Sequence, residues 1–384
     1  MSAAAPGSPL RIGVAGCTGA VGIEIVNVLK DRGFPVSEVV LFASARSAGK
    51  TLETKFGPLV VQEFGVEAAR ACDVVFFAVS GSFATEHAAA VCAAPGGALV
   101  IDNSSAFRYD DAVPLVIPEI NAGAIGDARL VANPNCTTAI AAMALWPLHR
   151  LFGLKKAIVS TYQAASGAGA AGMEELKAGA RSSLDGAAPA DIAHEAFVHP
   201  LPFNVIPHID VFGENGYTKE EMKVVWETRC VRSSTRDFLV MSRSSTSSLT
   251  HSLTHSLLLC LLQYSKIFGL PDLAVSCTAV RIPTFRAHAE AITLETERPV
   301  DLAAARAAIE AAPGVELVDE PGEKRYPMPM NATEKYDVEC GRMRKSLVFG
   351  DCGLDLFVCG DQILRGAALN AVLIAEAARE AGKI

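Results

Sequence analysis

The sequence predicts an α/β fold that begins with a parallel, doubly wound sheet. Three observations predict it. The chain has 384 residues, enough for about two domains. A glycine-rich turn joins its first apolar strand to a helix, and apolar strands alternate with helical segments along residues 1–133. This alternation is typical of a parallel sheet covered by helices on both faces, in which ligands bind at the carboxyl ends of the strands.

The first strand and helix form a candidate phosphate-binding turn. The run RIGVAG predicts a buried strand, Gly16, Gly19 and Gly22 follow at GxxGxxG spacing, and VGIEIVNVL has helical periodicity. Glycines at such a turn let the backbone approach a pyrophosphate, whose charge the helix N-terminus stabilises. The alternative is an ordinary tight turn between a strand and a helix.

The second strand ends in a segment that indicates which dinucleotide binds. An NAD site would have an acidic residue here to hold the ribose 2′-hydroxyl. The segment ASARSAGK instead offers Ser44, Arg46 and Ser47. A guanidinium and hydroxyls suit a 2′-phosphate, so we expect NADP. The alternative is a solvated arginine in a loop.

Two further buried strands, in CDVVFFAVSG and GALVIDNSSAFR, end in small polar residues. Asn103, Ser104 and Arg108 follow the second of them. In a parallel sheet they would lie at the edge where ligands bind.

Cys136 is the candidate nucleophile. The stretch VANPNCTTAIAAMAL predicts a strand end, a tight Asn-Pro-Asn turn and a helix, with the thiol at the junction. A helix N-terminus favours a thiolate, and its unpaired amides could stabilise an oxyanion. The alternative, a buried structural cysteine, is the usual fate of a free Cys.

A nucleophilic Cys needs an acid/base partner, and His288 is a candidate. It lies in AVRIPTFRAHAEAITLE, which alternates as a strand. Arg281 is seven positions earlier, so in one regular strand the two side chains would lie on opposite faces. They converge only if the chain breaks near Ile282 and Pro283. Taken alone, His288 is more typical of a structural histidine.

Two more segments offer polar side chains. Gln163, Ser166 and Gly167 follow a strand in STYQAASGAGAAGMEEL, which could orient a substrate and accept a nicotinamide, or be only a flexible loop. GYTKEEMKVVWETR predicts a helix with Thr218 as its N-cap. Glu220 and Lys223 then share one helix face, although a solvated surface ion pair is the ordinary interpretation.

Composition excludes several classes of protein. The net charge is −8, with no basic block, which argues against nucleic acid as a partner. The sequence has no long uncharged apolar run that would predict a membrane span. Ten cysteines without a CxxC pair or metal-like spacing indicate a reducing compartment and no metal. MSAAAPGSPL is too short for a targeting peptide, so we expect a cytoplasmic protein, or a plastid stromal one whose transit peptide has been removed.

Together, these motifs resemble the aspartate-β-semialdehyde dehydrogenase family along nearly the whole chain. The motifs that carry the resemblance are GCTGAVG, ASARSAGK, DNSSAFR, NPNCTT, TYQAASGAG, EEMK, RIPTFRAH and GDQILRGAALN. The resemblance implies a Rossmann-type NADP-binding domain, residues 1–133 plus about 358–384. It also implies a mixed α+β catalytic and dimerisation domain, residues 134–357, and a homodimer or homotetramer.

By the same resemblance, Cys136 is the nucleophile that forms an acyl thioester and His288 is the acid/base residue. Arg281 would bind the substrate carboxylate, Glu220 its ammonium group, and Gln163 would orient it. The implied reaction reduces 4-phospho-L-aspartate to L-aspartate 4-semialdehyde, releasing phosphate. It serves the synthesis of diaminopimelate, lysine, threonine, methionine and isoleucine.

The resemblance also assigns the phosphate and the cofactor. Arg108 and Lys223 would bind phosphate. The implied cofactor contacts are Thr18, Gly19, Ala20, Val21, Arg46, Ser47, Ser166, Gly167 and Gln362. Two alternatives remain: an N-acetyl-γ-glutamyl-phosphate reductase, whose family has a glycine where this chain has Asn135, or a homologue that has lost catalysis.

Residues 230–265 depart from the family. These 36 residues contain no Ala, Gly, Pro, Lys or Glu, and fourteen are Ser or Thr. Joining Arg229 to Lys266 would restore one continuous helical pattern. We therefore expect the segment to be dispensable for the fold, and interpret it as translated non-coding sequence rather than a lineage-specific loop.

Overall fold

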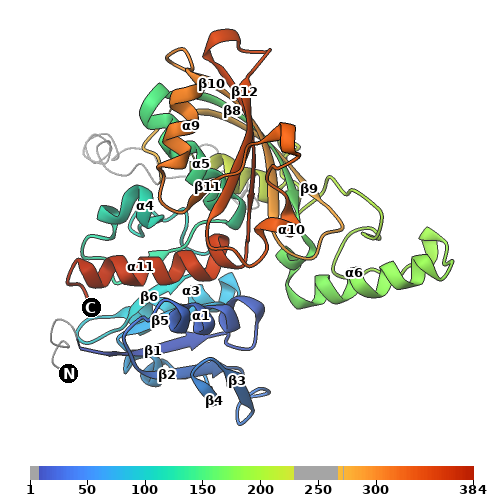
Figure 1. Cartoon of the computed structure of the whole chain (residues 1–384). Coiled ribbons are helices and arrows are strands. Elements are labelled where there is room, and N and C mark those ends of the chain that lie inside the picture. The colour runs from blue at the N-terminus through green and yellow to red at the C-terminus, as the bar shows by residue number, and fades with distance from the viewer. Residues whose placement is uncertain (1–7, 229–266, 271) are drawn as a thin grey trace, which may run out of the picture.

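A computed structural model describes residues 8–228, 267–270 and 272–384 (Figure 1). The segment 230–265 lies outside the described residues, so its expected dispensability stays a prediction. Val224 and Val225 before it pack in the same buried cluster as Ile267 and Phe268 after it.

The first domain is built on a seven-stranded sheet in the order β3-β4-β2-β1-β5-β6-β7. All its neighbouring strands are parallel except β3 and β4, which form an antiparallel pair. The strands are β1 (Leu10–Ala15), β2 (Val36–Ala43), β3 (Thr51–Thr54), β4 (Gly57–Glu63), β5 (Val74–Phe77), β6 (Leu99–Asp102) and β7 (Leu130–Ala132). Its helices are α1 (Ala20–Asp31), α2 (Val66–Arg70), α3 (Gly81–Cys92) and α4 (Pro118–Asn121).

The second domain has a mixed six-stranded sheet in the order β11-β12-β13-β10-β8-β9. Its strands are β8 (Leu154–Gln163), β9 (Ala274–Arg281), β10 (His288–Thr296), β11 (Val315–Leu317), β12 (Val338–Lys345) and β13 (Gly353–Gly360). Its helices are α5 (Cys136–Phe152), α6 (Gly169–Leu184), α7 (Lys219–Thr228), α9 (Leu302–Glu310) and α10 (Pro329–Ala332). Helix α6 extends away from the rest of the molecule (Figure 1). The α/β class with a second, mixed domain is confirmed.

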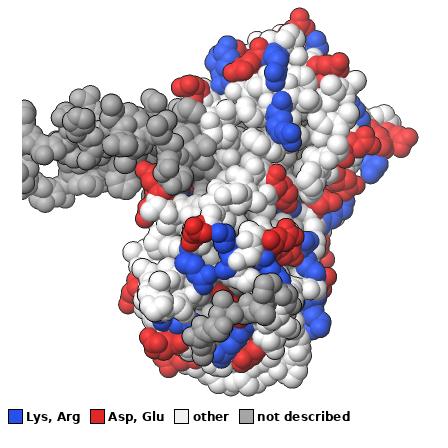
Figure 2. Space-filling view, turned by 90° about the vertical axis from the view of Figure 1, so that its left-hand side faces the viewer, with Lys and Arg blue, Asp and Glu red and all other residues white. Residues whose placement is uncertain are grey.

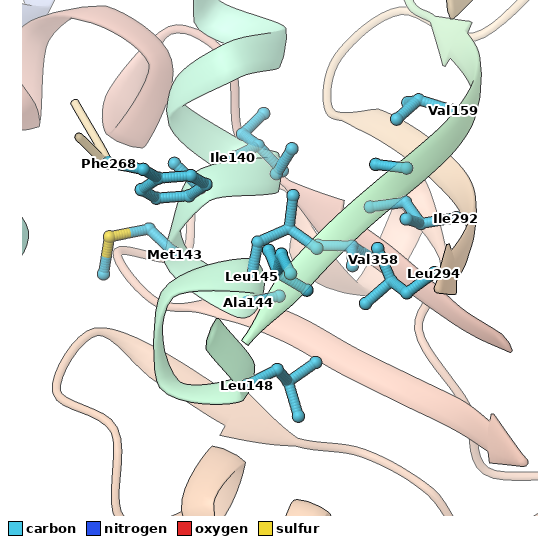
Figure 3. Packing of buried hydrophobic residues seen from close by; sticks show 14 of the residues in the cluster. Ile140, Met143, Ala144, Leu145, Leu148, Val159, Phe268, Ile292, Leu294 and Val358 are labelled. Atoms are coloured by element: carbon cyan, nitrogen blue, oxygen red, sulfur yellow. The ribbon is translucent and has the colours of Figure 1, made fainter. Parts of the chain in front are cut away.

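Helix α5 connects the two domains and forms the centre of the second core. Eleven of its 17 residues are buried, because apolar side chains surround most of the helix. Ile140 and Leu145 pack with Ile292, Leu294 and Val358, which belong to the sheet (Figure 3). This packing fixes the axis of α5 and therefore the place of its first residue.

The end of the chain returns to the first domain. Strand β13 extends to Gly360, so the returning segment begins at Asp361. Helix α11 (Leu369–Glu380) follows and contributes Leu369, Val372 and Ile374 to the core around the first sheet. In Figure 1, α11 lies beside α1. The returning segment thus passes between the domains.

The surface has charges of both signs. On the face in Figure 2, Lys and Arg side chains alternate with Asp and Glu, as expected from a chain without a basic block. Within the described residues, no helix is long and apolar enough to cross a membrane.

Candidate active site

Cys136 is the first residue of α5, as the sequence predicts. The strand β7 ends at Ala132, and Asn135 caps the helix. The Asn135 side-chain oxygen accepts hydrogen bonds from the Thr137 and Thr138 amides at 3.0 and 3.2 Å. Asn is among the best residues at this position because its oxygen satisfies helix amides that have no partner within the helix.

The protonation state of Cys136 differs from the expectation. Burial raises the pKa of its thiol to about 11, and the negative charge of Glu220 adds to the rise. The Thr137 hydroxyl and the charges of Arg108 and Lys223 oppose it but are too weak. The expected thiolate at the helix N-terminus is therefore wrong for the protein without substrate, because desolvation of the sulfur outweighs the local positive field.

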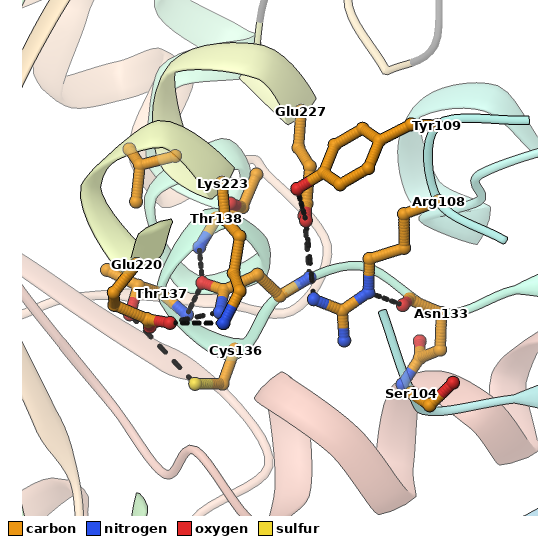
Figure 4. Close-up of polar contacts among 12 residues, drawn as sticks. Ser104, Arg108, Tyr109, Asn133, Cys136, Thr137, Thr138, Glu220, Lys223 and Glu227 are labelled. Atoms are coloured by element: carbon orange, nitrogen blue, oxygen red, sulfur yellow. Dashed lines mark hydrogen bonds and ion pairs between the residues drawn. The ribbon is translucent and has the colours of Figure 1, made fainter. Parts of the chain in front are cut away.

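Glu220 is the centre of a hydrogen-bond network beside the thiol (Figure 4). Gln163 at the end of β8 donates to Glu220 Oε1 at 3.0 Å and to the Thr137 hydroxyl at 2.8 Å. The side-chain amide of Asn135 donates to Glu220 Oε1 at 3.0 Å. These contacts connect the substrate-orienting candidate, the cap of α5 and helix α7.

Lys223 and Glu220 form an ion pair at 2.8 Å, and Asp210 lies 3.0 Å from the same ammonium group. Burial would raise the pKa of Glu220, but Lys223 and the surrounding hydrogen bonds lower it to about 2. Glu220 is 6 % exposed. The alternative of a solvated surface pair is therefore wrong, since the side chains of Lys223 and Glu220 are only 13% and 8% exposed.

A capping box fixes the start of α7, which carries Glu220 and Lys223. The Thr218 amide donates to Glu221 Oε2 at 2.7 Å, and the Glu221 amide donates to the Thr218 hydroxyl at 3.3 Å. The predicted N-cap at Thr218 is confirmed. Two reciprocal hydrogen bonds hold the first turn of α7 in place. They therefore fix the main-chain positions from which the Glu220 and Lys223 side chains extend.

Arg108 and Glu227 form a second buried ion pair, at 3.3 Å. The Arg108 guanidinium also donates to the main-chain oxygens of Asn133 at 2.8 Å and Asn103 at 2.9 Å. Glu227 Oε2 accepts the main-chain amide of Asn135 at 2.6 Å. The sequence interpretation did not select Glu227. Its available signal was position, because Glu227 follows Lys223 by four residues and therefore shares its helix face.

Arg281 and His288 converge, although they do not belong to one strand. Arg281 ends β9 and His288 begins β10, and β8 lies between these strands in the sheet. A Cβ atom added at Gly167 would lie 2.7 Å from Arg281 Nη1 and 3.5 Å from His288 Nε2. The prediction of one alternating strand over residues 279–295 is wrong, because the structure has two strands there. The expected break after Arg281 is present and lets both side chains face Gly167.

The hydrogen bonding of His288 determines which ring nitrogen carries the proton. The Ala164 main-chain amide donates to Nδ1 at 3.0 Å, so the neutral ring carries its proton on Nε2. Burial and the positive charge of Arg281 lower the pKa of His288 to about 3. Nε2 is buried and has no hydrogen-bond partner among the described residues. Neutral His288 is therefore arranged to donate a hydrogen bond to a ligand.

Arg281 is a buried cation without an acidic partner in the part of the chain that the structure describes. One nitrogen donates to the Ala164 carbonyl at 2.6 Å, and the guanidinium lies 5.6 Å from the centre of the Phe197 ring. Burial lowers its pKa. A buried guanidinium that faces only a carbonyl and an aromatic ring suits an anionic ligand.

The glycine-rich turn borders a cavity of about 890 Å³. Gly16 has a φ of +84°, and a Cβ there would lie 2.1 Å from the Ala78 carbonyl oxygen. Gly19 caps α1 without a side-chain hydrogen bond, so the first amides of the helix face outward for a phosphate. These features fit a dinucleotide.

The predicted cofactor residues form two groups. Those at the cavity are Thr18, Gly19, Arg46 and Ser47, with Ala20 and Val21 beginning α1 behind it. The second group lies near His288. There the Gln362 amide donates to the Ser166 hydroxyl, and Gln362 Oε1 accepts the Ala287 amide at 2.8 Å. The first group lies at the glycine-rich turn and the second beside His288, so their role as contacts to one dinucleotide stays a prediction.

Comparisons with known proteins identify the family of the two domains. The family pattern described as "Semialdehyde dehydrogenase, NAD binding domain" matches residues 11–128, and "Semialdehyde dehydrogenase, dimerisation domain" matches residues 145–241 and 258–365. The interruption at 242–257 lies within the atypical segment 230–265.

Curated proteins that match this chain over nearly its full length are aspartate-semialdehyde dehydrogenases. The aspartate-semialdehyde dehydrogenase of Synechocystis is 42% identical, with 98% of this chain and 99% of the relative covered. That of Aquifex aeolicus is 40% identical, covering 95% and 97%. A crystal structure of aspartate semialdehyde dehydrogenase II from Vibrio cholerae, complexed with ASA, has a TM-score of 0.82 at 34% identity and covers 97% of this chain and 99% of its own.

Proposed function

Since the chain belongs to the aspartate-semialdehyde dehydrogenase family, we propose that Cys136 performs the family's reaction through a thioester. The protein is an oxidoreductase of amino-acid biosynthesis that uses a nicotinamide cofactor. Its reaction interconverts 4-phospho-L-aspartate and the reduced cofactor with L-aspartate 4-semialdehyde, phosphate and the oxidised cofactor. The observation that carries the proposal is the convergence of Arg281 and His288 beside Gly167, on the sheet that α5 packs against with Cys136 at its first residue.

Substrate binding begins with charge. Arg281 binds the α-carboxylate through a bidentate contact, because its buried guanidinium lacks an acidic partner among the described residues. Glu220, an anion with its pKa near 2, meets the substrate ammonium group. Gln163 donates to Glu220 and Thr137 and keeps the network rigid.

The contact between Glu220 and the substrate ammonium group also prepares the Cys136 nucleophile. Glu220 raises the pKa of the Cys136 thiol, so an ammonium group at Glu220 offsets that effect and lowers the pKa. The thiol releases its proton to solvent, because the Nδ1 lone pair of His288 is occupied by the Ala164 amide. The thiolate then attacks the aldehyde carbon. A carbon–sulfur bond forms while the carbonyl π electrons move to oxygen. A thiolate suits this step because it is both a good nucleophile and a good leaving group.

His288 stabilises the resulting oxyanion by donating its Nε2 hydrogen. A bound nicotinamide cofactor supplies the hydride acceptor in this direction and the hydride donor in the reverse. Loss of hydride from the tetrahedral carbon leaves the Cys136 thioester. The alkoxide needs no proton in either direction, so a hydrogen-bond donor is enough here, and His288 acts as the acid/base residue only if the Ala164 contact is released.

Phosphate completes the oxidative direction. Arg108 and Lys223 bind it, and its oxygen attacks the thioester carbon and expels the Cys136 thiolate. Biosynthesis runs in the reverse direction, and phosphate is then the first product. We propose NADP as the cofactor because Arg46 and Ser47 line the cavity where an acidic residue would select NAD.

The dimerisation domain supports a homo-oligomer, and we propose a homodimer or homotetramer. The expected cytoplasmic or stromal location stays a prediction. A direct test mixes the purified protein with aspartate semialdehyde, phosphate and NADP⁺ and follows NADPH absorbance. We expect turnover that depends on phosphate and is abolished by Cys136→Ala. Turnover with the N-acetylglutamate analogue instead would contradict the substrate assignment.

A further inference from the structure

The structure assigns to Glu227 the role of an internal counter-ion that competes with phosphate for Arg108. This inference rests on the proposed function, in which Arg108 is a phosphate ligand. Glu227 would then determine how strongly the site binds phosphate, although it lies outside the motifs that predict the site residues. The role is electrostatic, since Glu227 does not contact the reacting atoms of the proposed mechanism.

Glu227 occupies a fully enclosed place one turn after Lys223 on α7. Its side chain is 0% exposed, and that of Arg108 is 8% exposed. Oε1 lies 3.3 Å from Arg108 Nη1 and accepts from the Tyr109 hydroxyl at the same distance. Oε2 accepts the Asn135 main-chain amide at 2.6 Å. Figure 4 shows the carboxylate between Tyr109 and Arg108, beside the turn that leads to Cys136.

Glu227 is not required to keep Arg108 in place. The two main-chain carbonyls of Asn103 and Asn133 bind other nitrogens of the guanidinium at shorter distances than Glu227 does. A buried guanidinium held by two carbonyls keeps its orientation without the carboxylate. Burial raises the pKa of Glu227, while the charge of Arg108 and the Asn135 main-chain amide oppose that rise. The contribution of the ionised Glu227 carboxylate to Arg108 is therefore its negative charge.

The charges around the proposed phosphate site explain how the negative charge of Glu227 affects phosphate binding. Two cations, Arg108 and Lys223, are paired with three carboxylates, those of Glu220, Glu227 and Asp210. A phosphate that enters must share Arg108 with a carboxylate of the same sign in a site of low effective dielectric. Binding is weakened, and in the biosynthetic direction the released phosphate leaves more easily.

The decisive variant is Glu227→Gln, which keeps an acceptor for the Asn135 amide and removes the charge. We expect the KM for phosphate in the oxidative direction to fall about tenfold, the scale for one like charge removed near a buried anion. The KM for aspartate semialdehyde should stay within about twofold, since Arg281 and Glu220 are unchanged. Inhibition of the biosynthetic direction by inorganic phosphate should strengthen in parallel. A phosphate KM that is unchanged or higher would overturn the inference.

Three further variants separate the possible causes. Tyr109→Phe removes a contact to Glu227 without changing the charge, and should leave the phosphate KM unchanged. Arg108→Ala tests the premise: if it does not raise the phosphate KM, the proposed phosphate site fails. If it does and Glu227→Gln has no effect, only the counter-ion role fails. Should the glutamine variant not fold, Glu227→Met supplies an uncharged side chain of similar length for the same comparison.

Discussion

Arg281 and Arg108 are equally buried, each 6% exposed, yet their surroundings differ. Arg281 faces the Ala164 carbonyl and the Phe197 ring, with no acidic partner among the described residues. Arg108 is bound by two carbonyls and is also neutralised by Glu227. The two guanidinium groups serve two anions in the proposed reaction.

The difference shows how one site can retain one anion and release another. A buried cation without a counter-ion gains most from a ligand carboxylate, because the ligand replaces the hydration that burial removed. A cation that already has a counter-ion gains less. In the proposed reaction, the substrate carboxylate must remain bound through two chemical steps, whereas phosphate enters or leaves between them.

The largest effect is expected when the charge of Arg281, the arginine without an acidic partner among the described residues, is removed. Arg281→Leu should lower kcat/KM for aspartate semialdehyde about 100-fold, since a charge-assisted bidentate contact contributes about 3 kcal/mol. The KM for phosphate should change by no more than about twofold. Steady-state kinetics with each reactant varied in turn measures both. Equal losses for the two reactants would mean that Arg281 supports the fold of the site rather than one anion.

A second variant extends the comparison to a cation at the cavity. Arg46 is exposed, unlike the two buried arginines. Arg46→Ser should raise the KM for NADP about tenfold or more, because a hydrogen bond to a charged group contributes about 1.5–3 kcal/mol. The KM for NAD should change little, since NAD lacks the 2′-phosphate. Lys50→Ser, an exposed cation nearby that does not line the cavity, is the matched control. A similar loss for both cofactors would remove the main support for NADP.

The smallest expected effect is on the reactivity of the Cys136 thiol. The negative charge of Glu220 and the positive charges of Arg108 and Lys223 act on it in opposite directions. The rate of alkylation by iodoacetamide should rise about tenfold per pH unit between about pH 8 and pH 10, because only the thiolate reacts and its pKa is about 11. Glu220→Gln should lower that pKa, since a negative charge that disfavours the thiolate is removed. Glu221→Gln changes the next buried acid of α7 and should leave it unchanged. A rate that levels off near pH 8 would contradict the assigned environment.

Local pattern was enough to predict the main-chain features of the site. Cys136 begins α5 because the Asn-Pro-Asn turn separates the strand from the helical run. Thr218 caps α7 because its hydroxyl accepts a hydrogen bond from the Glu221 amide in the first turn. Gly16 adopts a positive φ at the predicted turn. Each of these depends on residues close in sequence, where turn and capping preferences act.

The features that pattern could not supply depend on packing between distant elements. Arg281 and His288 converge because β8 lies between their strands, which no periodicity shows. Glu227 meets Arg108 across 119 positions of the chain. The pKa of the Cys136 thiol is raised because burial outweighs the helix N-terminus, and burial is a property of the assembled domains.

In the proposed reaction, Cys136 carries the substrate as a thioester until phosphate arrives. The direct measurement mixes the enzyme with aspartate semialdehyde and NADP⁺ in the absence of phosphate and determines the mass of the peptide that contains Cys136. We expect rapid formation of NADPH in an amount equal to the enzyme present, a gain of one aspartyl group on that peptide, and loss of this group when phosphate is added. NADPH formation with unmodified Cys136, or an aspartyl group on another residue, would contradict it.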